Sequence, residues 1–287
     1  MLKRIVMLGA VVVSISLVLF MIYGAKSEND TEIIKDPGVG TELEQKVLSF
    51  TMDGRSSKGV KQWHLEGNSA EIIKDDIYLN DLSAVAYGDT YTIYLTSNNG
   101  IYNKEEGQVE LMGDVIVTLA DGFMLTTERA SWSQKTKEIF TDAVVLIKRD
   151  KLTAVGTGGK ANSDLGVAFL FKEVTVSMEP DTTVYCDGPL ELNYNKKIAV
   201  FHNNVKVKDK DGKLFSDKLI VEFDPETEQF KQVTAEGNVK TQKGNNCTLS
   251  EKAIYTESTK SVRLLGRPRI IIDPQELAEF DGFGGAI

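Results

Sequence analysis

The sequence offers few side chains with the types and spacing that chemistry requires. The stretch GTGGKA at residues 156–161 comes closest to a phosphate-binding motif. A P-loop needs a glycine five residues before its Gly-Lys pair and a serine or threonine after it, but Ala154 and Ala161 occupy these positions. We therefore interpret the stretch as a glycine-rich turn, and any nucleotide hydrolysis must belong to a partner.

The remaining reactive side chains are equally sparse. The two histidines, His64 and His202, are far apart in the sequence, and no G-x-S-x-G or H-E-x-x-H motif occurs. Two cysteines and two histidines exclude a Cys/His zinc module built from this chain alone. We predict no catalytic residue, no metal site and no cofactor. A carbohydrate-cleaving β-helix enzyme stays open as an alternative, because carboxylates are numerous.

Two other clusters have more than one interpretation. Cys186 directly precedes Asp187, whereas Cys247 lies four residues before the aligned Glu251, and this misalignment disfavours a disulfide. Five lysines also lie close together in the sequence, which indicates either a solvated strand face or contacts with lipid phosphates. They are Lys206, Lys208, Lys210, Lys213 and Lys218.

The overall charge excludes one class of partner. The chain has 287 residues with 33 basic and 42 acidic side chains, for a net charge of −9. Three basic and no acidic residues lie before residue 27, so the rest of the chain is more acidic still. Nucleic-acid binding needs a basic face to neutralise phosphates. We therefore expect no nucleic-acid partner.

The N-terminus has the features of a membrane anchor. Lys3 and Arg4 precede an uncharged run over residues 5–25, and about 20 apolar residues cross the hydrocarbon core as a helix. The positive-inside rule places the N-terminus in the cytoplasm and the rest outside. A cleaved signal peptide is the alternative, but Tyr23 is bulky for a cleavage site. We expect an anchor over residues 1–25 and a linker over 26–46.

An internal repeat organises the rest of the chain. Residues 111–117 (LMGDVIV), 201–207 (FHNNVKV) and 235–241 (AEGNVKT) share a Gly or Asn, then an Asp or Asn, and then a Val that starts an alternating run. Weaker copies bring the period to about 30 residues over six units. A second element follows the strong copies, as in 127–132 (TERASW), 216–223 (SDKLIVEF) and 250–255 (SEKAIY). The repeat predicts at least two strands per unit.

The alternation within each copy predicts strands with one apolar and one polar face. Val115, Val117 and Leu119 alternate with Asp114 and Thr118, because successive side chains of a strand point to opposite faces. Stacked units of this kind bury a continuous core. We predict an all-β, elongated stack of about 30-residue units behind one transmembrane helix, either an open β-jelly-roll or a β-solenoid.

The last predicted strand is unusually apolar. Ile270, Ile271 and Ile272 follow Arg263, Arg267 and Pro268. One interpretation is that the flanking residues guard the edge against aggregation. The other is that this edge docks another β protein by strand addition.

Several segments resemble the LptC family of membrane-anchored periplasmic proteins of lipopolysaccharide export. The similar features are the N-terminal span, residues 63–70 (WHLEGNSA), 111–117, 122–128 (GFMLTTE) and the aromatic Trp132. The following part resembles the related LptA/OstA-like periplasmic domain, in 186–192 (CDGPLEL), 203–207, 216–219, 235–239 and 253–255. The similarity suggests an LptC-like β-jelly-roll over residues 47–180, an LptA/OstA-like extension over 181–274 and a tail over 275–287.

The resemblance implies a non-enzymatic role in lipopolysaccharide transport. It implies an inner-membrane, single-pass protein with a periplasmic β-jelly-roll. The protein would receive lipopolysaccharide from an inner-membrane ABC transporter, with its permease and ATPase subunits. It would then pass the lipid along an apolar groove toward an LptA-like or outer-membrane OstA-like partner, joined by edge-strand pairing. The alternative is an anchored β-solenoid scaffold that bridges or polymerises in the envelope without carrying lipid.

The predicted inward side chains are the candidates for lining such a groove. A filled core of the protein's own side chains is the competing interpretation for each of them. They are Val115, Val117, Leu119, Leu125, Trp132, Leu192, Val205, Val207, Leu219, Val221, Phe223, Val239 and Tyr255.

Overall fold

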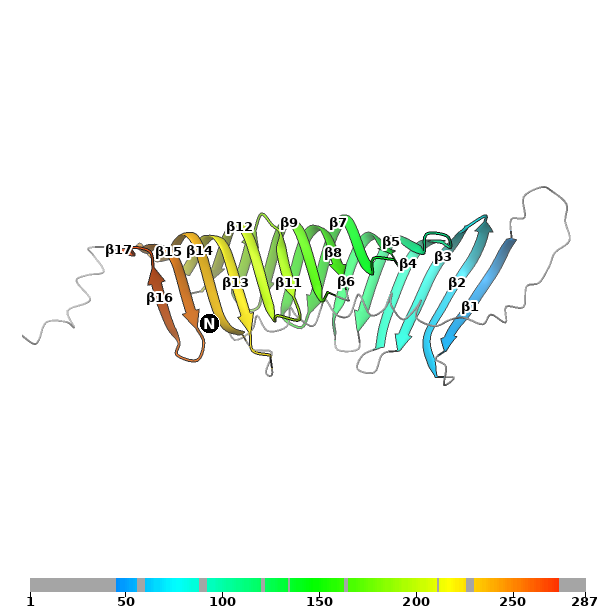
Figure 1. Cartoon of the computed structure of the whole chain (residues 1–287), viewed down its shortest axis with the longest axis horizontal. Helices are drawn as coiled ribbons and strands as arrows, with labels where there is room; N and C mark the ends of the chain where they lie inside the picture. Colours follow the sequence, from blue (N-terminus) through cyan, green and yellow to red (C-terminus); the bar gives the residue numbers. More distant parts are fainter. Residues whose placement is uncertain are drawn as a thin grey trace, which may run out of the picture. The chain divides into compact units, whose positions relative to one another are not determined.

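The fold was analysed in a computed structural model of the chain (Figure 1). It describes residues 45–55, 60–87, 92–119, 122–133, 135–162, 165–210, 212–225 and 230–273. The described chain divides into two compact units. The N-terminal unit holds the chain up to Asp150 together with Gly156–Phe169, and the C-terminal unit holds Lys151–Val155 and the chain from Leu170 onward.

The N-terminal unit is a run of antiparallel strands, each paired with the next along the chain. Its first seven strands are β1 (Gln45–Arg55), β2 (Lys61–Ile73), β3 (Asp76–Tyr87), β4 (Thr92–Asn103), β5 (Gln108–Leu119), β6 (Met124–Ser133) and β7 (Glu138–Arg149). Two further strands contribute residues to both units, β8 (Leu152–Asn162) and β9 (Val167–Met178).

The C-terminal unit continues in the same way, with two interruptions. Its strands are β10 (Thr182–Cys186), β11 (Leu190–Asn193), β12 (Ile198–Asp209), β13 (Gly212–Phe223), β14 (Phe230–Lys243), β15 (Asn246–Thr256), β16 (Ser261–Leu265) and β17 (Arg269–Ile271). Both β10 and β11 pair with β12, and both β16 and β17 pair with β15. Each of these short pairs therefore takes the place of one long strand that is broken in the middle.

The repeated sequence motif forms a corner. Strands of about a dozen residues bend near their middle at residues with a left-handed backbone, where the pairing register also shifts. Bulges of this kind bend a strand, and Asp, Asn and Gly tolerate the left-handed conformation best. Figure 1 shows the long strands curving at this corner from one layer of each unit into the other. The non-glycine residues with this backbone at the corner are Ser49, Asp81, Asp114, Glu173, Asn203, Asn204, Asn238 and Arg267.

Two buried hydroxyl groups bond backbone carbonyls at the corner of the N-terminal unit. The buried Ser97 hydroxyl donates to the carbonyl of Asn99 at 2.7 Å and to that of Met112 at 3.2 Å. The Thr141 hydroxyl donates to the carbonyl of Arg129 at 2.6 Å. The bulge interrupts the hydrogen bonds between the two strands, and these hydroxyl groups bond backbone carbonyls there instead. The carbonyls are therefore not buried without a hydrogen-bond donor, which would be destabilising.

Exposed polar side chains at the corner join neighbouring strands on its outer side. Asn98 Nδ2 donates to Asp114 Oδ2 at 3.1 Å, and Asn238 Nδ2 donates to Asp217 Oδ2 at 2.9 Å. Between β6 and β7 the equivalent contact is an ion pair, in which Arg129 Nη2 donates to Asp142 Oδ2 at 2.8 Å. This guanidinium holds the pKa of Asp142 below its ordinary value.

The all-β fold predicted from the sequence is confirmed, and the repeat corresponds to its corner. The interpretation of residues 156–161 as a turn is wrong, because this stretch lies inside strand β8. Gly158 has a φ of 71°, which places the glycines at a bend within a strand rather than between two strands. The predicted anchor, linker and tail lie almost wholly outside the described residues, within which no helix is long and apolar enough to cross a membrane.

Two glycines provide a test of the backbone geometry. Gly188, between β10 and β11, has a φ of 102°, and a Cβ there would lie 2.1 Å from the carbonyl oxygen of Phe171. Gly122 has a φ of 86° but open space around it. Gly122→Ala should cost about 1 kcal/mol of unfolding free energy, and Gly188→Ala about 3 kcal/mol or more, because it adds a backbone clash. Urea unfolding followed by circular dichroism measures both losses, and equal losses would contradict this geometry.

Candidate functional site

The inward faces of the strands form an apolar interior in each unit. In the C-terminal unit we call layer A the strand halves that align with β10 and β17, and layer B those that align with β11 and β16. Residues directly opposite each other on paired strands share a face. The pairing register therefore shows which side chains line the interior.

Three rows of side chains face inward in the C-terminal unit. The first row, in layer A, runs Val184, Val207, Leu214, Thr241, Thr248 and Ile270. The other two rows, in layer B, run Leu192, Ala199, Val221, Val233, Tyr255 and Val262, and Leu190, Phe201, Leu219, Ala235, Ala253 and Leu264.

The burial of these rows falls toward the last strand of the unit. Val184 is 4% exposed, Leu214 and Thr248 are half-buried, and Ile270 is 67% exposed. Along layer B, Val221 is fully buried whereas Val262 is 61% exposed. Because β16 and β17 pair only with β15 among the described strands, the interior ends in apolar side chains that face solvent.

The N-terminal unit has an interior of the same kind. One inward row runs Leu65, Ala84, Leu95, Val117, Leu125 and Ile147. Its first strand is again the exposed end, since Val47 and Met52 on β1 are 40% and 44% exposed. An apolar surface therefore reaches the outer strand of this unit too.

The structure places most of the predicted groove residues in these interiors. Eleven of the thirteen are buried, and only Val207 and Tyr255 are half-buried. Their inward orientation agrees with the alternation in the sequence. Their burial shows that the protein's own side chains occupy much of the space between the layers, so a lipid-lining role remains a prediction.

Sequence reasoning missed several members of the same rows. Val184 and Leu214 lie beside the predicted Val207 in the register, and Leu95 lies beside Val117. Val184 and Leu95 lie on strands without a strong copy of the repeat motif, and Leu214 lies on β13 before its copy at residues 216–223, so the motif alone did not identify them. The signal that was available is the two-residue spacing of Ile93 and Leu95 and of Val184 and Cys186.

Burial shifts the pKa values of three titratable groups near the interior. Burial raises the pKa of the Cys186 thiol to about 11, and the Tyr255 hydroxyl, which donates to Glu257 at 3.0 Å, has a raised pKa mainly because of burial. Burial also lowers the pKa of His202. Cys186 and Cys247 are both free thiols. No cluster of three metal-ligating side chains occurs among the described residues.

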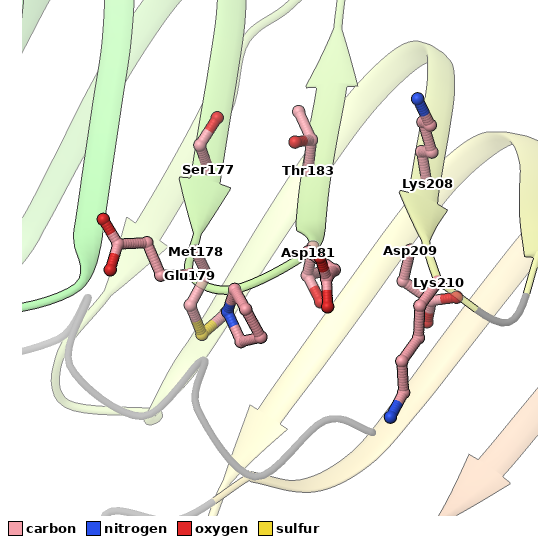
Figure 2. A pocket seen from close by; sticks show the side chains of 10 residues that line it. Ser177, Met178, Glu179, Asp181, Thr183, Lys208, Asp209 and Lys210 are labelled. Carbon is pink, nitrogen blue, oxygen red and sulfur yellow. The ribbon is translucent and has the colours of Figure 1, made fainter.

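A cleft of about 350 Å³ lies at one end of layer A in the C-terminal unit (Figure 2). The turn between β9 and β10 forms one wall, with Glu179 and Asp181, and Lys208 and Lys210 lie on the other side. Asp209 accepts a hydrogen bond from the backbone of Gly212 at 3.0 Å, so it caps the next turn. Carboxylates and ammonium groups together give the cleft no preference for one sign of ligand.

Comparisons with known families agree with the two-part resemblance. A family model described as lipopolysaccharide-assembly, LptC-related, matches residues 10–179. A second model, described as LptA/(LptD N-terminal domain) LPS transport protein, matches residues 189–281. The two matches follow each other along the chain without overlap and confirm an LptC-like part followed by an LptA-like part.

One similar solved structure is LptH from Pseudomonas aeruginosa, described as the LptA homologous periplasmic component of the lipopolysaccharide transport device. The sequences are 14% identical, and the match covers 63% of this chain and 95% of LptH with a TM-score of 0.18. No curated protein matches the chain.

The two thiols should differ in reactivity. Cys186 is fully buried and its pKa is raised to about 11, whereas Cys247 is half-buried. We expect dithiobis(nitrobenzoic acid) at pH 8 to modify Cys247 in the folded protein and Cys186 only after unfolding, because the thiolate is the nucleophile. A Cys247→Ser variant should show no fast reaction, and fast modification of Cys186 in that variant would contradict its burial.

Proposed function

We propose that this chain, which belongs to the LptC-related family of lipopolysaccharide-assembly proteins, carries lipopolysaccharide acyl chains along its apolar interior. The family membership gives it a role in lipopolysaccharide transport. The finer proposal is that it receives the lipid from an inner-membrane ABC transporter. It would then pass the lipid through its two parts toward the outer membrane.

One observation carries this proposal, namely the inward rows that become exposed at the last strand. Ile270 and Val262 continue buried rows but face solvent. A soluble domain with a closed core normally ends its apolar rows with polar or shielding residues. An interior that ends in exposed aliphatic side chains fits a surface along which an acyl chain continues into a neighbouring protein.

The free energy of acyl-chain burial favours transfer between joined proteins over a protein that carries the lipid through water and releases it. Burying an acyl chain contributes about 0.8 kcal/mol per CH₂, so a chain of about a dozen carbons gains about 10 kcal/mol. Release into water from such a site would be very slow. Transfer from one apolar interior to the next keeps the chain buried throughout, and the driving energy would come from the ATPase partner, since this chain has no P-loop.

The packing of the interior sets a condition on lipid entry. Val205, Val221 and Val239 are at most 1% exposed, so their side chains touch protein on all sides. An acyl chain would enter only if the two layers move apart. This dense packing also supports the alternative function, an envelope scaffold that carries no lipid.

The proposed location follows from the N-terminal sequence. Residues 1–25 would form a single span in the inner membrane with a cytoplasmic N-terminus, and residues 26–46 would link it to the periplasmic strands. Strand β17 pairs only with β15 among the described strands, and Ile270, Ile271 and the following Ile272 are 67%, 53% and 45% exposed. We therefore propose that β17 pairs with a strand of an LptA-like or outer-membrane OstA-like protein.

Photocrosslinking at two adjacent residues tests lipid carriage. Tyr255 faces the interior and Ile254 the opposite side of the same strand, and both are half-buried. With p-benzoylphenylalanine in their place, we expect lipopolysaccharide adducts from position 255 and none from position 254. Adducts should also require an ATPase-active transporter. Only protein adducts from position 255 would favour the scaffold.

A proline substitution tests edge pairing. Ile271→Pro removes a backbone donor from β17, so we expect loss of co-purification with the neighbouring β-jelly-roll protein. Ile271→Val keeps the donor and the strand preference and should retain the partner. Unfolding midpoints of the two variants should match because the edge is exposed. Retained co-purification of the proline variant would exclude pairing through β17.

A further inference from the structure

Two outward rows of layer A in the C-terminal unit contain cations and no carboxylate. We name this surface the basic face, and the register defines it as two rows across β10, β12, β13, β14, β15 and β17. The first row runs Tyr185, Lys206, Phe215, Lys240, Leu249 and Arg269. The second runs Thr183, Lys208, Lys213, Gln242, Cys247 and Ile271.

These rows bring together charges that are distant in the sequence. Lys206 lies on β12, Lys240 on β14 and Arg269 on β17, all at one level. Alternate strands are about 10 Å apart, so these cations form a regular array. Figure 2 shows the start of the second row, where Thr183 and Lys208 lie side by side on neighbouring strands.

Carboxylates lie at the margin of the basic face and not within its two rows. Glu179 and Asp181 line a cleft with Lys208, and Tyr185 donates to Asp187 at 2.8 Å. Lys206 lies over the Tyr185 ring, 5.3 Å from its centroid.

All five cations are exposed, and none forms an ion pair with a described residue. Lys208 lies directly opposite Lys213, a like-charge pair that destabilises a sheet. The repulsion between these neighbouring cations lowers the stability of the sheet, and the chain as a whole is acidic, with a net charge of −9. A cluster of cations in such a chain therefore indicates an anionic ligand.

The outer face of layer B in the same unit shows the contrast. There, Lys252 pairs with Glu236 at 2.7 Å and holds the pKa of that carboxyl below its ordinary value. Gln232 donates to Glu222 at 3.1 Å. Lys218, which the sequence placed in the lysine cluster, lies beyond the corner opposite Glu236 and so belongs to layer B. The outer face of layer B therefore carries an ion pair between neighbouring strands, whereas the two rows of the basic face carry none between described residues.

The composition of the basic face distinguishes a lipid surface from a protein. Protein interfaces are depleted in lysine and enriched in arginine, whereas four of these five cations are lysines. Lysine acts as a mobile point charge that suits phosphate headgroups in a fluid layer. Apolar and aromatic side chains, half-buried Phe215 and 53%-exposed Ile271, lie between the cations, as in membrane-interfacial surfaces.

We propose that the basic face docks the C-terminal unit onto the surface of a bilayer that contains anionic phospholipid. The lysines would contact headgroup phosphates while Phe215 and Ile271 reach the interfacial region. Anionic bilayers attract basic residues with about 1 kcal/mol each, which makes five cations sufficient for a measurable, salt-sensitive attachment. This docking is independent of whether lipopolysaccharide passes through the interior.

Sedimentation with vesicles tests the docking. The full chain in phosphatidylcholine nanodiscs is mixed with sucrose-filled vesicles of phosphatidylcholine that contain or lack phosphatidylglycerol. We expect binding only to the anionic vesicles and a loss of affinity of about 100-fold or more when all five cations are replaced (K206Q, K208Q, K213Q, K240Q and R269Q). High salt should weaken wild-type binding in the same direction.

A matched variant separates the face from the net charge. It removes five exposed cations of the same unit that lie outside the two rows, namely K151Q, K172Q, K196Q, K231Q and R263Q. This variant should bind anionic vesicles nearly as well as the wild type. Binding through the N-terminal segment is common to all three proteins and cannot produce a difference between them. Equal losses in the two variants, or no preference of the wild type for anionic vesicles, would overturn the proposal.

A label on the face reports the contact directly. Cys247 lies in the second row and is half-buried, whereas Cys186 is fully buried, so a thiol-reactive nitroxide marks the face selectively. Anionic vesicles should immobilise this nitroxide in the wild type and not in the five-cation variant.

In cells, p-benzoylphenylalanine at Phe215 should give phospholipid adducts, and adducts to an acidic protein alone would overturn the lipid assignment.

Discussion

The whole structure depends on one constraint, which is that each long strand must bend without changing the side chains it turns inward. A bulge with a left-handed residue meets this constraint because it inserts residues at the bend and increases the local twist. Asp114, Asn204 and Asn238 take this backbone on three different strands. Since the bend recurs about every 30 residues, apolar side chains on both sides of each corner face one interior.

The corner also explains which part of the structure could be predicted from the sequence. The bend needs a restricted set of residues, so it leaves a readable motif such as Gly113-Asp114 before Val115. Alternation then predicts the inward side chains on either side, and the all-β fold follows. The glycine-rich stretch was misinterpreted because glycine marks both turns between strands and bends within strands, and only the pairing shows that Gly158 belongs to the second kind.

The basic face could not be predicted in the same way. Its cations come from four strands, and no sequence window shows that Lys206, Lys240 and Arg269 share one row. The lysine cluster predicted from sequence proximity was wrong for one member. Lys218 follows Lys213 closely in the sequence but lies past the corner, on layer B. Surface properties of a bent sheet depend on the register, whereas the interior depends on alternation within each strand.

If both proposals hold, the interior and the outer face contact lipid in different ways. The interior is dense where Val205 and Val221 pack, so it would bind an acyl chain only by exchanging protein contacts for lipid contacts of similar energy. Such an exchange nearly cancels in free energy and allows movement along the rows instead of tight capture. The outer cations lose no packing when they meet phosphates, and their attraction reaches over about a Debye length. A chain with both features would hold its position at a membrane electrostatically while leaving the apolar rows free for transfer.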